Sequence, residues 1–283
     1  MPGTLYLVAT PIGNLEDITY RAVRLLKEAD IIACEDTRHT RKLLAHFGVS
    51  KPLVSYHEHN EEQRAEELIE RLREGKSVAL VSDAGMPVVS DPGYRLVRRA
   101  AEEGIPVVPA PGPSAPLTAL AASGLPSDRF TFLGFLPPRG AQRRETLRRI
   151  AEMDTTVILF EAPHRILATL DDLRQVAGDR PIVAAREMTK IHEEFLRGTA
   201  EEVREELARR NSIKGEFTIV IGKPPEEKAP EPDEGAIRAA VDEQTAAGVS
   251  RMEAIKAVAR RFKLPKRRVY EIVAAEQGED GES

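Results

Sequence analysis

Short apolar segments alternate with longer amphipathic segments over residues 1–125 of the 283-residue chain. A short apolar run rich in β-branched side chains is typical of a buried strand, whereas apolar residues three and four positions apart are typical of a helix. The clearest helix is predicted at 60–74, where Leu68, Ile69 and Leu72 share one face. This alternation predicts a mainly parallel α/β sheet covered by helices. The predicted strands are 4–9, 31–34, 53–56, 77–82 and 106–110.

Residues 126–222 show a different pattern, with more of the character of hairpins. The segments 181–188 and 193–199 follow each other with only a few polar residues between them, which is typical of a hairpin. We therefore predict a second lobe with a mixed α/β sheet and a cleft between the two lobes. The predicted strands are 130–136, 155–161, 181–188, 193–199 and 215–222, and the predicted helices are 141–152, 163–177 and 201–210.

The acidic segment 223–235 contains four prolines and is predicted to be a linker. The tail beyond it, 236–283, is predicted to be a separate helical unit. Ser250 and Glu253 form a capping box at the start of one helix, and a turn at 264–268 separates that helix from the next. Two short helices joined by a tight turn predict a helix-turn-helix-like unit.

The composition excludes several classes of protein. No apolar run approaches the ~20 residues of a membrane span, and the first residues lack the basic region of a signal peptide. Cys34 is the only cysteine, so no intrachain disulfide is possible, which fits a reducing cytoplasm. The net charge of −5 argues against a chain that binds nucleic acid over its whole surface, but not against a local basic patch.

Such a patch lies in the tail. Seven basic residues and no acidic residue occur from Lys256 to Arg268. In an acidic chain this segregation predicts phosphate contacts to a nucleic acid, although an exposed helix pair with chance clustering would look the same. The residues predicted to bind the nucleic acid are Arg260, Arg261, Lys263, Lys266, Arg267 and Arg268.

Three loops rich in glycine and proline, 9–14, 82–93 and 110–115, follow predicted strands of the first lobe. Ligands of open α/β sheets bind at the carboxyl ends of the strands, so the three loops together predict one shared pocket. None of them carries a lysine, a P-loop motif or a dinucleotide fingerprint. This argues against a nucleoside triphosphate and against a dinucleotide.

The 82–93 loop suits a ligand with a flat apolar part and a few hydroxyls or amines. Its glycines let backbone amides approach a ligand closely, and Asp83 can accept hydrogen bonds. Asp83 and Asp91 could bind a divalent metal, but no further oxygen ligand clearly joins them, and we predict no metal site. Alternatively, the loop is only a tight turn in which Ser82 and Asp91 cap helices.

Two polar segments near predicted strand ends are candidate substrate contacts. In one, Asp36 would cap a helix that begins near Arg38, and Arg38 and Arg41 would contact phosphates unless they lie on a solvated face. In the other, His57 is a candidate polar contact to the substrate. His57 and His59 could together bind a metal, but no third ligand is apparent.

Eight short motifs, in order along the chain, resemble the RsmI family, which comprises small-subunit ribosomal RNA ribose methyltransferases of the tetrapyrrole methylase superfamily. The resemblance covers nearly the whole chain, including the basic tail. Met86 stands where the family usually has threonine, so this position has no hydroxyl to contact a cofactor. The motifs are LVATPIGNLEDIT (7–19), CEDTRHTRKLL (34–44), SYHEHN (55–60), SDAGMPVVSDPGY (82–94), PGPSA (111–115), FEAPHR (160–165), AREMTKIHEE (185–194) and GEFTIVI (215–221).

The resemblance implies two α/β lobes of the class III methyltransferase fold, with S-adenosylmethionine (SAM) in the cleft between them. It also implies 2′-O-methylation of a cytidine in the decoding region of 16S ribosomal RNA, and a homodimer. Phe160 and Glu161 would close over the adenine, while Ser114 and Ala115 would open a helix whose N-terminal amides suit a carboxylate. The implied cofactor contacts are Pro11, Asp83, Ala84, Gly85, Met86, Val88, Ser114, Ala115, Phe160 and Glu161.

The charged segment 185–194 supplies the candidate catalytic residues. A ribose 2′-hydroxyl is a weak nucleophile at neutral pH and needs a proton acceptor or strong polarisation. Lys190, near a sulfonium and other cations, could have a lowered pKa and act as the base. Glu187 competes for that role, and Arg186 lies beside them. Alternatively, these residues are charges on a solvated turn.

Two other functions stay open. A SAM enzyme could methylate a tetrapyrrole or a modified protein side chain, but a small porphyrinoid needs no basic tail. A non-catalytic RNA-binding or ribosome-assembly factor would keep the tail and bind no SAM.

Overall fold

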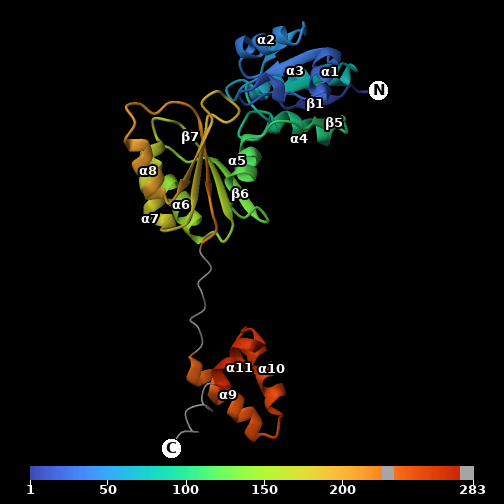
Figure 1. Ribbon diagram of the computed structural model, residues 1–283. Coiled ribbons are helices and arrows are strands. Elements are labelled where there is room, and N and C mark those ends of the chain that lie inside the picture. The colour runs from blue at the N-terminus through green and yellow to red at the C-terminus, as the bar shows by residue number, and fades with distance from the viewer. Residues whose placement is uncertain (225–232, 275–283) are drawn as a thin grey trace, which may run out of the picture. The chain divides into compact units, whose positions relative to one another are not determined.

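The computed structural model describes residues 1–224 and 233–274. The chain forms two compact units, Met1–Pro225 and Glu226–Ser283 (Figure 1). Much of the predicted linker and the last part of the tail lie outside the described residues. Within the described ranges, no helix is both long enough and apolar enough to cross a membrane.

The first sheet contains five parallel strands in the order β3-β2-β4-β1-β5. Parallel neighbours need crossover connections, and the amphipathic segments between the strands supply them as helices. The fold therefore confirms the parallel α/β lobe predicted from the alternating pattern. The strands are β1 (Leu5–Val8), β2 (Ile31–Cys34), β3 (Leu53–Ser55), β4 (Val78–Val81) and β5 (Val107–Ala110).

Helices cover both faces of this sheet. Successive strand side chains point to opposite faces, so Val78 and Leu80 of β4 join one core cluster while Ala79 and Val81 join another. The first cluster includes α3 (Glu61–Arg73) and α4 (Tyr94–Glu102), and the second includes α1 (Tyr20–Glu28) and α2 (Thr37–His46). A 3₁₀ helix, η1 (Leu15–Asp17), follows the loop after β1.

The second sheet is mixed, with the strand order β6-β7-β10-β8-β9. β6 (Phe130–Phe135) and β7 (Thr156–Glu161) are parallel, and the other neighbours are antiparallel. β8 (Ile182–Arg186) and β9 (Glu194–Gly198) form the predicted hairpin, and β10 (Phe217–Ile221) lies between β7 and β8. The mixed sheet predicted for the second lobe is confirmed.

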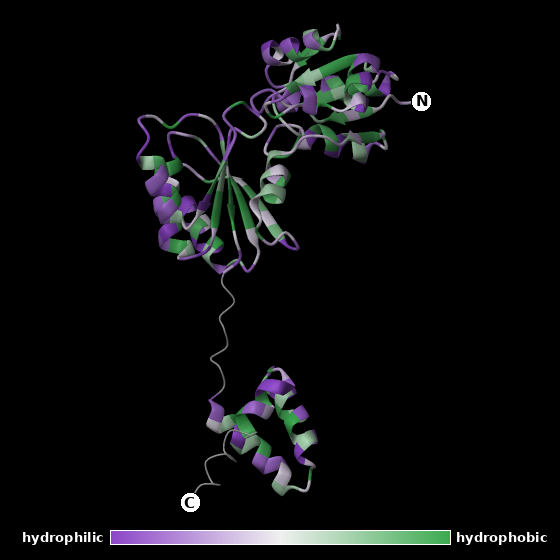
Figure 2. Ribbon diagram, in the orientation of Figure 1, coloured by the Kyte–Doolittle hydropathy of each residue, from purple (hydrophilic) through white to green (hydrophobic). Residues whose placement is uncertain are grey.

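Four helices pack on the second sheet. α6 (Gly140–Glu152), α7 (Ile166–Ala177) and α8 (Ala200–Ala208) cover one face, and α5 (Ala115–Ser123) covers the other. Figure 2 shows hydrophobic strands and hydrophilic outer helix faces. α5 falls inside the range predicted for the first lobe but packs on the second sheet. Its sequence, APLTALAAS, is almost entirely apolar, and a helix with no continuous polar face is stable when buried.

In its described residues, 233–274, the second unit is a cluster of three helices, α9 (Glu234–Ala246), α10 (Arg251–Arg261) and α11 (Lys266–Ala274). The predicted N-cap of α10 is present, because the Ser250 hydroxyl accepts a hydrogen bond from the backbone N–H at the third helical position. The turn before α11 passes through Lys263 in a left-handed conformation with φ of +53°. The core contains Ile237, Val241, Ile255, Val258, Val269, Ile272 and Val273.

Candidate active site

The three glycine-rich loops follow β1, β4 and β5, which are neighbours in the first sheet. Because these strands are parallel, their carboxyl ends lie at one edge. The backbone N–H of Thr10 donates to the carbonyl of Gly85 at 2.9 Å, and the Gly85 N–H donates back at 3.0 Å. The Thr10 hydroxyl also donates to the carbonyl of Ser82 at 3.1 Å. These bonds hold the first two loops together.

The second sheet brings three further segments to one edge. In its antiparallel register, Phe217 pairs with Glu161 of β7 on one side and with Arg186 of β8 on the other. The end of β7, the start of β10 and the end of β8 therefore lie together, since antiparallel neighbours run in opposite directions. The turn 187–190 follows β8 directly.

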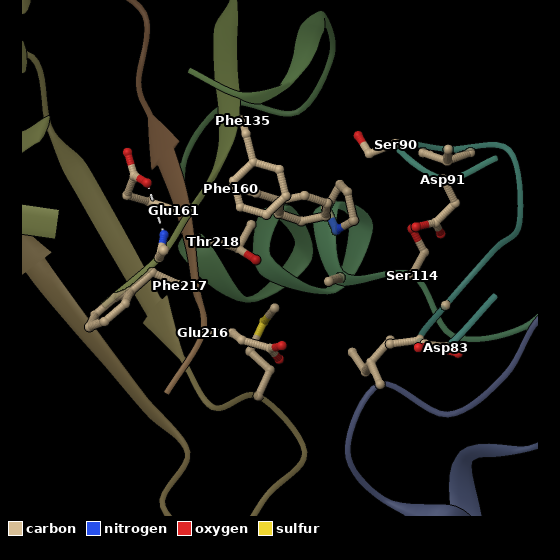
Figure 3. Close-up of a pocket in the computed structure, with 18 of the residues that line it drawn as sticks. Asp83, Ser90, Asp91, Ser114, Phe135, Phe160, Glu161, Glu216, Phe217 and Thr218 are labelled. Atoms are coloured by element: carbon tan, nitrogen blue, oxygen red, sulfur yellow. Dashed lines mark hydrogen bonds between the residues drawn. The ribbon is translucent and has the colours of Figure 1, made fainter. Parts of the chain in front are cut away.

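These two edges line a cavity of about 370 Å³ (Figure 3). Its volume lies within the roughly 300–1,000 Å³ that is typical of small-molecule sites. Figure 3 shows Asp83 and Asp91 on the side of the first lobe, and Phe160 and Glu216 on the side of the second. A ligand in this cavity would contact both lobes.

Most of the residues predicted to bind the cofactor or to act in catalysis line this cavity, but Pro11, Val88 and Arg186 do not. Pro11 lines a neighbouring cavity. Val88 packs against the core of the first sheet, with a φ of +77° that is unusual for a β-branched residue. The predicted residues along the cavity are Asp83, Ala84, Gly85, Met86, Ser114, Ala115, Phe160, Glu161, Glu187 and Lys190.

Several lining residues were not among the predicted site residues. Phe135 and Thr218 belong to apolar strand segments, and the periodicity of a strand predicts burial and not a ligand contact. Glu216 reaches the cavity because β10 lies between β7 and β8. The order of strands in a sheet leaves no local signal, although Glu216 and Thr218 do lie within the motif GEFTIVI.

Aromatic rings form one wall of the cavity. The Phe160 ring centroid lies 5.0 Å from that of Phe132 and 5.4 Å from that of Phe135. Phe135 is 57% exposed even though it is a large apolar side chain. Clustered rings with an open face offer a flat apolar surface to a heteroaromatic ligand.

Carboxylates form part of the opposite wall. Burial raises the pKa of Asp91 to about 6, although a hydrogen bond with Ser82 opposes the shift. The negative charges of Glu35 and Asp83 raise it further. A positively charged ligand would therefore be stabilised here, because it compensates Asp83 and Asp91, which form no ion pair with any described residue.

The alternative in which Ser82 and Asp91 cap helices is wrong for α4. The N-cap residue of that helix is Gly93, which has no side chain to accept a capping hydrogen bond. Its first N–H groups are instead bound by Glu61, whose carboxylate accepts from Gly93 at 3.2 Å and from Arg95 at 3.4 Å. Asp91 is thus left to face the cavity.

Lys190, which lines the cavity, lies in an ion-pair network. Its Nζ atom is 2.9 Å from Glu187 Oε1 and 3.1 Å from Glu216 Oε2. Partial burial lowers the pKa of Lys190, but hydrogen bonds to the two carboxylates outweigh it, and the net pKa is raised. The expectation of a lowered lysine pKa is therefore wrong, since the neighbours of the ammonium group are anions.

The turn that carries Lys190 has an unusual backbone. Glu187 and Thr189 have φ values of +50° and +66°, a region that side chains disfavour. A Cβ at Gly13 would lie 2.7 Å from Thr189 Oγ1, so the first-lobe loop packs tightly against this turn. Strained conformations of this kind persist where the surroundings impose them, and they cluster at functional sites.

Arg186 does not reach the cavity, which corrects its predicted catalytic role. Its guanidinium donates to Glu194 at 2.7 Å and to the carbonyl of Lys214. Glu194 is also bound by Arg210. Arg186 therefore holds the start of β9 and the segment before β10 in place.

Glu161 lines the cavity, but its carboxylate is occupied elsewhere. It accepts hydrogen bonds from Thr169 Oγ1 at 2.5 Å and from the Ala162 N–H at 2.9 Å, and Arg165 Nε lies 3.2 Å away. Arg143 donates to Thr169 from the other side at 3.0 Å. The predicted contact of this side chain with an adenine is thus replaced by a positioning role at the end of β7.

Glu161→Ala is expected to lower the free energy of unfolding by about 3 kcal/mol, because it leaves buried hydrogen-bond donors without their anion. Chemical denaturation followed by circular dichroism measures this. Glu152→Ala is the matched control: this exposed glutamate pairs with Arg148 at 2.6 Å, and exposed pairs contribute less than about 1 kcal/mol. Equal losses in the two variants would contradict the positioning role.

The predicted RNA contacts of the first lobe, Arg38, Arg41 and His57, have different surroundings in the structure. Asp36 caps α2 by accepting from the Arg38 N–H at 2.7 Å, as predicted. Its carboxylate also binds the Arg38 guanidinium at 2.9 Å, which lowers the pKa of Asp36 to about 2. His57 contacts Asn60. Like Arg41, it lines neither the cavity of the candidate site nor the neighbouring cavity that Pro11 lines.

The basic residues of the tail differ in their pairing. Arg267 pairs with Glu271 at 2.9 Å, and Arg268 pairs with Glu234 at 3.3 Å. Lys256 and Arg260, four positions apart on α10, are exposed and make no ion pair with any described residue. Arg261, Lys263 and Lys266 are also exposed and also form no ion pair with a described residue.

The fold and the cavity place the chain in a known class. A family described as Tetrapyrrole (Corrin/Porphyrin) Methylases matches residues 4–204. The structure of a diphthine synthase is similar with a TM-score of 0.61 at 19% identity, covering 78% of this chain and 90% of that one. The cobalt precorrin-4 methyltransferase CbiF gives a TM-score of 0.59 at 20% identity, covering 77% and 94% of the two chains. The chain belongs to the tetrapyrrole methylase family.

Two curated proteins define the subgroup. Ribosomal RNA small subunit methyltransferase I of Halalkalibacterium halodurans is 52% identical over 95% of this chain and 94% of its own length. The protein of the same name from Bacillus subtilis is 44% identical over 95% of this chain and 93% of its own. Within the tetrapyrrole methylases, the chain is a member of the family of ribosomal RNA small subunit methyltransferase I.

Proposed function

We propose that the protein is a SAM-dependent methyltransferase that acts on 16S ribosomal RNA of the small subunit. The proposed reaction is methylation of the 2′-oxygen of a cytidine ribose in the decoding region. The observation that carries the proposal is the two-lobed cavity with aromatic and acidic walls, in a chain 52% identical to a ribosomal RNA small subunit methyltransferase I.

The lining of the cavity fits SAM in three places. The Phe135 and Phe160 rings suit the adenine. The N-terminus of α5 suits the carboxylate, because Ser114 makes no side-chain capping bond and the N–H groups of Ala115 and Leu117 are left for a ligand, although Pro116 between them has none. Asp83 and Asp91 suit the cationic sulfonium and ammonium groups. A related solved structure, uroporphyrin-III C-methyltransferase from Thermus thermophilus, is described as complexed with S-adenyl homocysteine.

The residues of the 187–190 turn would prepare the ribose hydroxyl. Bound SAM supplies a methyl group whose bond to sulfur breaks, with the electron pair staying on sulfur, as the bond to the ribose oxygen forms. The Lys190 ammonium stabilises negative charge that develops on that oxygen. Glu187, whose pKa is lowered by its hydrogen bond with Lys190, is ionised at neutral pH and accepts the hydroxyl proton. Lys190 is thus assigned to polarisation, and Glu187 to the role of base.

Methyl-labelled SAM and small-subunit particles that lack the modification test this function. After the reaction, the RNA is hydrolysed with alkali, which needs a free 2′-hydroxyl to cleave. Label in an alkali-resistant dinucleotide is the expected result. Label in mononucleotides would mean methylation of a base. No transfer to RNA, with SAM still bound, would support the tetrapyrrole or protein-side-chain alternative, and no SAM binding would support the non-catalytic factor.

SAM affinity is expected to fall as the pH drops below about 6. Asp91 has a pKa raised to about 6, so it is ionised above that pH and attracts the sulfonium, but is neutral below it. Isothermal titration calorimetry between pH 5 and 8 measures the change. Asp91→Asn should bind more weakly at pH 8 and show little pH dependence; a wild-type profile that stays flat would contradict the role of Asp91.

We further propose that the enzyme is a cytoplasmic homodimer. Its single cysteine fits a reducing compartment. The first unit exposes large apolar side chains, among them Tyr94, Val108 and Leu117, which a second copy would cover. Light scattering coupled to gel filtration separates a dimer from a monomer.

A further inference from the structure

A second cavity, of about 520 Å³, adjoins the candidate active site. It has five lining residues in common with the first cavity, and the two cavities meet along this shared wall: Ile12, Asp83, Ala84, Lys190 and Glu216. The far side of the second cavity is built by the loop after β1, by η1 and by one face of α2. A molecule held there would contact the Lys190 ammonium close to a ligand of the first cavity.

The α2 side of this cavity is basic. His39 and Lys42 line it, and they are three positions apart, so they share one face of the helix. Both side chains are exposed, and neither forms an ion pair within the described part of the chain. Arg38, on the adjoining face, is bound to Asp36 at 2.9 Å instead. The charges available for an anion are therefore those of Lys42 and, when protonated, His39.

The rest of the second cavity has an apolar part next to α2 and a polar part at the shared wall. Leu15 and Leu43 offer apolar contacts beside the two basic side chains. At the shared wall, the Lys190 ammonium offers a donor to a hydroxyl group, and the proposed base Glu187 lies 2.9 Å from that ammonium. An anion site, an apolar surface and a hydroxyl site in one cavity match the phosphate, base and ribose of a nucleotide.

We propose that the second cavity receives the nucleotide that is methylated, with Lys42 and His39 binding its phosphate. The ribose hydroxyl then lies at the shared wall, between Lys190 and the methyl donor in the first cavity. A nucleotide reaches such a cavity only when it is splayed out of its stack, which single-stranded RNA segments allow. This inference rests on the proposed function and assigns the substrate side of that site.

Steady-state kinetics of Lys42→Ala with small-subunit particles tests the proposal. We expect the KM for the particle to rise about tenfold, kcat to change by less than about twofold, and the salt dependence of binding to weaken by about one charge. His39→Ala should raise KM less, and Lys42→Arg should restore most of the affinity. The Kd for SAM, measured by calorimetry, should not change, because Lys42 does not line the first cavity.

Lys27→Ala is the matched control, since Lys27 is an exposed lysine on α1 that lines neither cavity. A KM for Lys42→Ala equal to that of Lys27→Ala would overturn the inference while the wild-type activity upheld the proposed function. An equal loss of SAM affinity and particle affinity would also overturn it, because the cavity would then belong to the cofactor. A wild-type protein that transfers no methyl group to RNA would reject the proposed function and the inference together.

Discussion

Lys190→Met is expected to slow methyl transfer about a thousandfold while the Kd for SAM changes by less than about threefold. Lys190 lies between Glu187 and Glu216, and its raised pKa keeps it protonated at neutral pH. Methionine keeps much of the side-chain volume but removes the positive charge that polarises the ribose hydroxyl. Removing one preorganised electrostatic contact of this kind costs roughly 10²–10³ in rate. Single-turnover transfer of labelled methyl measures the rate, and calorimetry measures the affinity.

Three comparisons make this result specific. Lys190→Arg keeps the charge and should recover part of the rate. Lys27→Met removes an exposed lysine outside both cavities and should leave the rate unchanged. The wild-type rate, plotted against pH, should show no titration of Lys190 near neutral pH. A step there that is lost in Lys190→Met would mean that a neutral lysine acts as the base. An unchanged rate in Lys190→Met would remove Lys190 from the mechanism.

Reversing two charges of the tail, Arg260→Glu with Lys263→Glu, is expected to weaken binding to small-subunit RNA about a hundredfold. Both side chains are exposed and have no ion-pair partner among the described residues. A protein that neutralises fewer phosphates releases fewer counterions, so the salt dependence of binding should also weaken by about two charges. Filter binding at several salt concentrations measures both effects, and the Kd for SAM should stay the same.

Arg24→Glu with Lys27→Glu on α1 is the control, because it makes the same change in net charge on an exposed helix of the first unit. It should weaken RNA binding far less, since a change in net charge alone acts only at long range and is screened by salt. Equal effects of the two pairs would show that the tail contributes only its share of the total charge. Arg267 and Arg268 make a less sensitive pair for this experiment, because Glu271 and Glu234 already neutralise part of their charge.

The elements of the fold were predictable because their signals are local. The alternation of Val78, Ala79, Leu80 and Val81 between two faces follows from the geometry of a strand. The three loops were predictable as one site for a related reason, since a parallel sheet brings the carboxyl ends of its strands to one edge. Their glycines also report backbone conformations directly, as at Gly85 with φ of +86°.

The chemical state of the site residues was not predictable, because it depends on partners far away in the sequence. Lys190 was expected beside cations, but β10 enters between β7 and β8 and brings Glu216 to it. Glu161 was expected to face the ligand, but Thr169 of α7 and Arg165, the N-cap residue of α7, bind its carboxylate. In both cases the motif identified the right place in the chain, and the tertiary neighbours set the role.

On α2, too, the place was predictable and the role of each residue was not. The sequence indicated a basic helix near the site, but not which of the basic side chains on that helix face the site. Arg38 and Arg41 were chosen from the motif, whereas His39 and Lys42 line the second cavity. A helix turns by about 100° per residue, so neighbouring positions point to different surroundings. Periodicity, capping and turn chemistry act within a few residues of each other and can be read along the chain. The order of strands and the rotation of a helix against its neighbours arise only when distant segments pack, and they decide which side chains share a cavity.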